Sequence, residues 1–159
     1  MSSNSSTSSS TVTKTVDRIM EEAIKGIFPT NITMTVEGIS QTISMHIRFD
    51  ETVTRGIIFA DVYCKEITNL HPNYVPPVKD YKLNIELTAV SQIVADKDSG
   101  LCVQLSRKLM EFVENTLTKS ALSTATGLTV DAVLFDSLST TNDAEDNIKT
   151  ISLTIYVQA

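Results

Sequence analysis

The sequence contains few of the residues that mark special chemistry or a special environment. Its 159 residues include two cysteines, Cys64 and Cys102, and no tryptophan. Two thiols are too few for a disulfide framework, and a chain of about 150 residues can bury a core without one. The sequence has no run of about 18 apolar residues to span a bilayer and does not open with a signal peptide. We therefore expect one soluble domain, synthesised and kept in a cytoplasm.

Basic residues are also in the minority. The chain carries 13 Lys and Arg against 19 Asp and Glu, a net charge of −6, and its cations do not cluster. Neutralising phosphates requires clustered Lys and Arg, so the composition argues against a protein that binds nucleic acid through a basic face.

Sequence motifs for catalysis and metal binding are absent as well. His46 and His71 occur without the HxH, HExxH or CxxC spacing that brings ligands together. The glycines and serines form neither GxSxG nor a phosphate-cradling loop. The acidic stretch 142–146 lacks the alternating ligands and central glycine of an EF-hand, and we interpret it as a solvated hairpin tip. We predict that the protein is not an enzyme and uses no metal or cofactor.

Composition divides the chain into two parts. Residues 1–11 are almost wholly Ser, Thr and Asn, too polar to bury anything, and predict a disordered tail. Residues 12–159 alternate between helical and strand-like apolar patterns and predict a single α+β domain.

Hydrophobic periodicity predicts the order helix, four strands, helix, two strands. Apolar residues recur at helical spacing over Val16–Ile27 and again over Cys102–Leu117, where Asp98 or Ser99 would cap the start. A short helical turn is expected over Lys119–Thr126, ended by Gly127. Strands with period two, or with a continuous apolar run, are expected at 32–37 and 43–50 as an antiparallel pair, and at 57–65, 83–89, 130–138 and 151–158.

The connections complete this predicted fold. Three prolines in the loop 69–80 cannot supply ladder donors, so this loop should run outside the sheet. The polar stretch 139–149 should join the last two strands as a long hairpin. We therefore predict an α+β fold in which two main helices pack on one face of a small mixed or antiparallel sheet.

The second half of the chain carries a family resemblance. The strand YKLNIELTAV runs into DSGLCVQLSRKLMEFVENTL, then LTVDAVLFDSL, an acidic loop and the last strand KTISLTIYVQA. With the first helix, this layout resembles the tail terminator (tail completion) proteins of long-tailed bacteriophages. The extra hairpin at 32–49 and the Ser-rich start depart from that plan, which leaves a related neck, connector or head-completion protein open.

The resemblance implies a structural virion protein of the tail or neck. It implies a homo-oligomeric ring, a hexamer, that caps the tail tube, ends its polymerisation and offers a docking surface to the head. The partners would be further copies of the chain, the tail tube protein and head-completion or neck proteins, with no membrane. Genome DNA would pass through an acidic lumen without specific binding. We expect the contacts with tube or neighbouring subunits at two loops: Asn73, Tyr74, Val75 and Lys79 in one, and Asp143, Glu145 and Asp146 in the other.

Two other classes of function stay open from the residues alone. A small-ligand-binding or enzymatic α+β domain would enclose an apolar pocket, with His46 and Asp61 as its first polar groups. An adaptor would bind extended peptides along an unpaired strand edge.

Overall fold

The computed structural model describes residues 14–36, 38–50, 58–76, 78–92, 100–142 and 147–159. Within these residues the chain forms three helices and seven strands in two sheets, an α+β fold as predicted. The predicted tail 1–11 lies outside the described residues.

The main sheet has five strands in the order β3-β4-β5-β7-β6. Strand β3 (Met45–Ile47) runs parallel to β4 (Ile58–Asn69), and every other neighbouring pair is antiparallel. The central strand β5 (Asp80–Ser91) pairs over its whole length with β7 (Asn147–Gln158), which pairs in turn with β6 (Thr129–Asn142). The sheet is therefore mixed, and β6 forms one of its edges.

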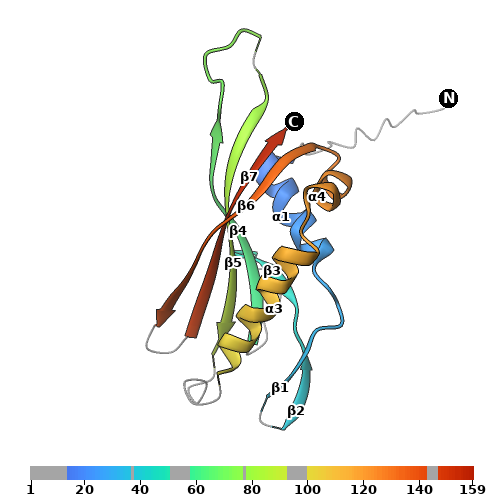
Figure 1. The fold of residues 1–159 in the computed structure, drawn as a ribbon, viewed down its shortest axis with the longest axis vertical. Helices are drawn as coiled ribbons and strands as arrows, with labels where there is room; N and C mark the ends of the chain where they lie inside the picture. Colours follow the sequence, from blue (N-terminus) through green and yellow to red (C-terminus); the bar gives the residue numbers. More distant parts are fainter. Residues whose placement is uncertain (1–13, 37, 51–57, 77, 93–99, 143–146) are drawn as a thin grey trace, which may run out of the picture.

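Three helices cover one face of this sheet (Figure 1). Helix α1 (Val16–Ile27) packs on β4 and β3, α3 (Leu101–Asn115) on β5 and β7, and α4 (Lys119–Thr126) on α1 and the start of β6. Each long helix buries the apolar stripe predicted from its 3.6-residue period, for example Ile24 in α1 and Leu109 in α3. The edge-to-face rings of Phe28 and Phe112, 5.3 Å between centroids, join the ends of the two helical segments.

The predicted antiparallel pair at 32–37 and 43–50 is wrong. Gly38 has a positive φ of 80° and turns the chain at once, so β1 (Thr33–Val36) pairs with β2 (Ile39–Thr42) as a short separate hairpin. The residues after it leave the hairpin and enter the main sheet as β3, parallel to β4. Alternation of apolar and polar residues located β1 and, within a longer predicted strand, β3, but it missed β2 and could not identify the strand partners.

The C-terminal hairpin is confirmed, with longer strands than predicted. Strands β6 and β7 pair from Thr129↔Gln158 to Asn142↔Asn147, so their connection is 143–146 instead of 139–149. The predicted caps Asp98 and Ser99 lie outside the described residues, and α3 begins directly after Gly100. The short helix α4 ends, as predicted, at Gly127, whose φ is 72°.

Candidate functional site

The proline loop, defined as residues 70–76 together with 78 and 79, projects from one end of the molecule (Figure 1). It connects β4 to β5 beyond the register pair Asn69↔Tyr81, away from the body of the sheet (Figure 1). Large apolar side chains are exposed on it, and Val75 is 94% exposed. These side chains are Leu70, Tyr74, Val75 and Val78. An exposed apolar cluster on a projecting loop is typical of a contact surface.

Local hydrogen bonds hold this loop in shape. The amide of Leu70 donates to the carbonyl of Asp80 over 2.8 Å, and the His71 ring nitrogen Nε2 lies 3.1 Å from an Asp80 carboxylate oxygen. The side chain of Asn69 accepts from the His71 amide, and the Tyr74 ring packs edge to face on the His71 ring at 5.2 Å. The apolar side chains are therefore carried on an ordered framework.

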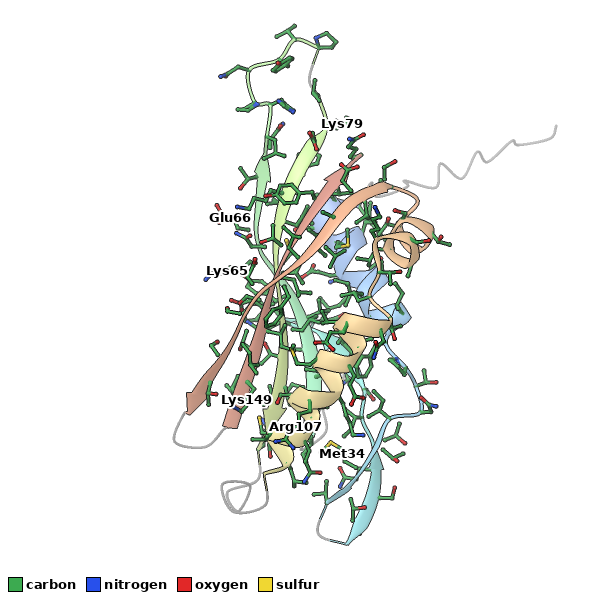
Figure 2. The ribbon with its side chains drawn as sticks, viewed as in Figure 1. Met34, Lys65, Glu66, Lys79, Arg107 and Lys149 are labelled. Atoms are coloured by element: carbon green, nitrogen blue, oxygen red, sulfur yellow. The ribbon has the colours of Figure 1, made fainter. Side chains whose placement is uncertain are left out.

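The structure brings four of the predicted contact residues together on this loop. Asn73, Tyr74, Val75 and Lys79 are all exposed there, and Figure 2 shows Lys79 near the base of the loop. The other three, Asp143, Glu145 and Asp146, lie outside the described residues. A contact role for these residues stays a prediction.

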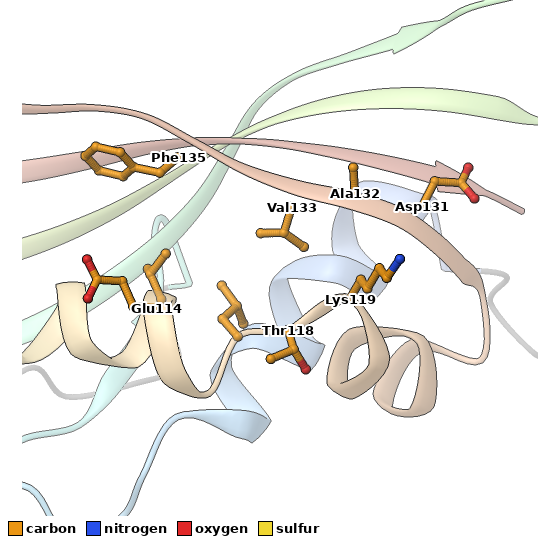
Figure 3. Close-up of a pocket in the computed structure, with 9 residues that line it drawn as sticks. Glu114, Thr118, Lys119, Asp131, Ala132, Val133 and Phe135 are labelled. Atoms are coloured by element: carbon orange, nitrogen blue, oxygen red, sulfur yellow. The ribbon is translucent and has the colours of Figure 1, made fainter.

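A groove between the helices and the edge strand β6 was not anticipated from the sequence (Figure 3). It has a volume of about 490 Å³ and an apolar floor formed by Val113, Leu117 and Val133. Its rim carries Phe135, which is 49% exposed, and three charged side chains. These are Glu114, Lys119 and Asp131, and none of them has an ion-pair partner within the described chain.

The groove exists because helix α3 packs on β5 and β7 and does not extend over the neighbouring edge strand β6. Phe135 is paired in register with Leu153, and both project to the helix side of the sheet. Leu153 is buried, whereas Phe135 and the nearby Leu138 stay exposed. The apolar run Val133-Leu134-Phe135 carried a signal of this surface, but only the placement of α3 shows which side chains remain uncovered.

Charged residues interrupt both exposed edges of the sheet at β-bulges. The short strand β3 pairs with residues 60–62 of β4, so the later part of β4 is an edge, as β6 is on the other side. In the described pairing, the register shifts once in β4, around Lys65, and twice in β6, around Asp131 and Asp136. A bulge twists the edge and breaks the ladder, and a charge there opposes the addition of another strand. Both edges are thus poorly suited to continuous strand pairing with another chain.

The sheet face that the helices leave bare carries a polar network around Arg48. The guanidinium contacts Asp61 through Nε at 3.2 Å and Nη2 at 3.1 Å, contacts Glu86 at 3.3 Å, and donates to Thr88. It also lies 5.0 Å from the centroid of the Tyr63 ring. In Figure 2 Lys65 and Glu66 extend from the same side of the sheet, away from the helices. The network joins β3, β4 and β5 and fixes the otherwise short parallel strand.

His46 and Asp61, the first polar groups of the ligand-binding alternative, are neighbours in the β3–β4 register. Both are buried, and the His46 ring packs edge to face on Phe59. Neither residue lines the groove beside β6, and in the described residues no group of three or more His, Cys, Asp or Glu could hold a metal ion. His46 thus contacts Phe59, and Asp61 contacts the Arg48 guanidinium.

Glu21 and Cys64 form a second, partly buried polar contact, between α1 and the bulge of β4. A Glu21 carboxylate oxygen accepts from the Cys64 amide at 3.1 Å, and burial raises the pKa of Glu21 above its ordinary value of 4.5. Burial and the nearby carboxylates of Asp17 and Glu21 raise the pKa of Cys64 to about 12. The raised pKa disfavours the reactive thiolate form of Cys64 at neutral pH.

No protein-family model matches this chain, and no curated protein matches its sequence. Among the described residues, no helix has the length and apolar character needed to cross a membrane.

Proposed function

We propose that this protein is a structural subunit that closes into a ring, caps a phage tail tube and offers the docking surface for the head. One observation carries the proposal. Two different exposed apolar surfaces, the proline loop and the groove beside β6, occupy separate parts of one molecule. A cyclic ring needs two such patches, because each subunit contacts its neighbour through unlike surfaces.

The fold is compatible with the resemblance that suggested this role. An amphipathic first helix, a small mixed sheet, a long second helix and a closing hairpin occur in that order. The net charge of −6 favours a lumen that repels DNA and lets it pass without adhering.

Two measurements on the purified full chain test the proposal. Mass photometry should detect a closed oligomer of one defined size, and a hexamer is expected. Negative-stain images after co-expression with the tail tube protein of the same phage should show tubes that each end in a single ring. Rings that bind a head-completion protein but leave tube length unchanged would favour the related neck or connector role instead.

A further inference from the structure

We propose that the proline loop of one copy seats in the groove beside β6 of the next copy. This inference rests on the proposed ring and names the contact that builds it. The groove is lined by Val113, Leu117, Val133 and Phe135, with Glu114, Lys119 and Asp131 at its rim.

Shape and polarity match between the two surfaces. The groove has an apolar floor and a volume of about 490 Å³, within the usual range for small-molecule pockets and so large enough to take a few side chains. A flat face cannot fill such a channel, whereas the loop projects and carries Tyr74 and Val75 at 60% and 94% exposure. Seating the loop removes apolar surface of both partners from water, which is the main source of favourable free energy in association.

The charges near the two surfaces are complementary. Lys79 at the base of the loop has no ion-pair partner within the described chain, and the same holds for Glu114. In Figure 3 Glu114 on α3 and Phe135 on β6 lie on opposite sides of the groove, toward the same end. The rim carries two carboxylates at opposite ends, Glu114 at one and Asp131 at the other, and the Lys119 ammonium lies near Asp131 (Figure 3). A loop that inserts its apolar tip at the Glu114 end brings the Lys79 ammonium to a carboxylate that has no ion-pair partner within the described chain.

The loop cannot reach the groove of its own chain. It projects beyond the end of the sheet, whereas the groove lies along the junction of α3 and α4 with β6 (Figure 1). The partner must therefore be another molecule, and in a ring it is a second copy. The bulges around Asp131 and Asp136 interrupt the β6 edge, so a strand of another copy could not pair continuously with it. The proposed contact avoids this obstacle because it is made by side chains.

Two complementary variants test the contact. Val75→Asp places a charge on the loop, and Phe135→Asp places one on the groove; both sites are exposed, so the fold should persist by circular dichroism and thermal melting. Each variant alone should lose the ring, with association weakened by about 100-fold or more, since an unpaired carboxylate would be buried at the contact. Ile39→Asp, at a 67% exposed position on the β1–β2 hairpin, is the matched control and should keep the ring.

Mixing the variants gives the sharper result. Phe135→Asp retains an intact loop and Val75→Asp an intact groove, so an equimolar mixture should form two-chain complexes and nothing larger in mass photometry. A mixture that stays monomeric overturns the inference, as does a Val75→Asp protein that still forms rings, or an Ile39→Asp protein that loses them equally. Wild-type protein that never assembles would instead contradict the proposed function itself.

Discussion

Arg48 supplies the positive charge at the centre of the bare sheet face. Its guanidinium, 22% exposed, lies between the carboxylates of Asp61 and Glu86 and beside the Tyr63 ring. Asp61 is almost fully buried, and a buried carboxylate deprived of its cation is costly. The short strand β3, only three residues long, is attached to β4 by backbone hydrogen bonds, and this side-chain network adds to them.

We predict that Arg48→Ala lowers the free energy of unfolding by about 3 kcal/mol, because it removes the cation that contacts the buried Asp61 carboxylate. Arg48→Lys should recover only part of this loss, since an ammonium cannot contact Asp61 through two nitrogens at once. Urea titration followed by circular dichroism measures both. Arg107→Ala, at an exposed site of α3, is the control and should change stability by less than about 0.5 kcal/mol. A loss for Arg48→Ala no larger than this would contradict the account.

Glu21 gives the fold a pH dependence of known sign. Because burial raises its pKa, the folded state holds this proton more tightly than the unfolded chain does. The stability contributed by the neutral form is present below pH 4.5 and is lost as the pH rises through the raised value.

We therefore predict that Glu21→Gln is more stable than the wild type at pH 7, since an amide oxygen can still accept from the Cys64 amide without a buried charge. The difference should open as the pH rises above 4.5 and vanish below it. Thermal unfolding of both proteins between pH 3.5 and 8 measures this, with Glu111→Gln at an exposed site as control. A wild type that is the more stable of the two at pH 7 would refute the assignment.

Residue identity alone could not reveal either polar contact. The sequence offered His46 and Asp61 only as the first polar groups of a possible ligand pocket, and it gave no sign of a role for Arg48. Their meeting depends on the parallel register His46↔Asp61, which places Arg48 across β4 and β5. Parallel partners distant along the chain leave no local pattern in a sequence.

At the scale of elements, the helices were predictable and the strand partners less so. The stripes of α1 and α3 follow directly from a 3.6-residue period, and the boundaries Val16–Ile27 and Lys119–Thr126 are confirmed. The sequence paired β1 with the wrong strand. The apolar alternation over 43–49 is longer than that over 39–42 and drew the assignment, but the positive φ of Gly38 turns the chain early enough for 39–42 to pair with β1. The groove beside β6 depends on which side chains of the sheet helix α3 leaves uncovered. The order of apolar and polar residues along the chain does not contain that information.

Two glycines near helix C-termini give predictions of opposite sign for substitution by alanine. Gly127 ends α4 at a φ of 72°, with open space where a Cβ would lie, so Gly127→Ala suffers backbone strain alone and should cost about 1 kcal/mol. Gly26 lies inside α1 with equally open space and ordinary φ, so Gly26→Ala should stabilise the protein by about 0.5 kcal/mol. Thermal melts of both proteins check the signs, and a shared sign would contradict this account of the helix ends.

At the scale of the whole molecule, the exposed surfaces are unlike and separate. The proline loop extends from one end of the sheet, the groove follows β6, and charged bulges at both edges oppose direct strand addition. Such a molecule is suited to head-to-tail contact through side chains, which grows without limit unless the rotation between copies closes. Closure into a ring of fixed size is the property on which the proposed capping role depends.

The mass of the wild-type assembly tests this central claim most directly. Mass photometry over a range of protein concentrations and salt should show one closed oligomer, a multiple of the 17.4 kDa chain, with no ladder of longer species. Single chains under all conditions, or an open series of masses that lengthens with concentration, would contradict the account.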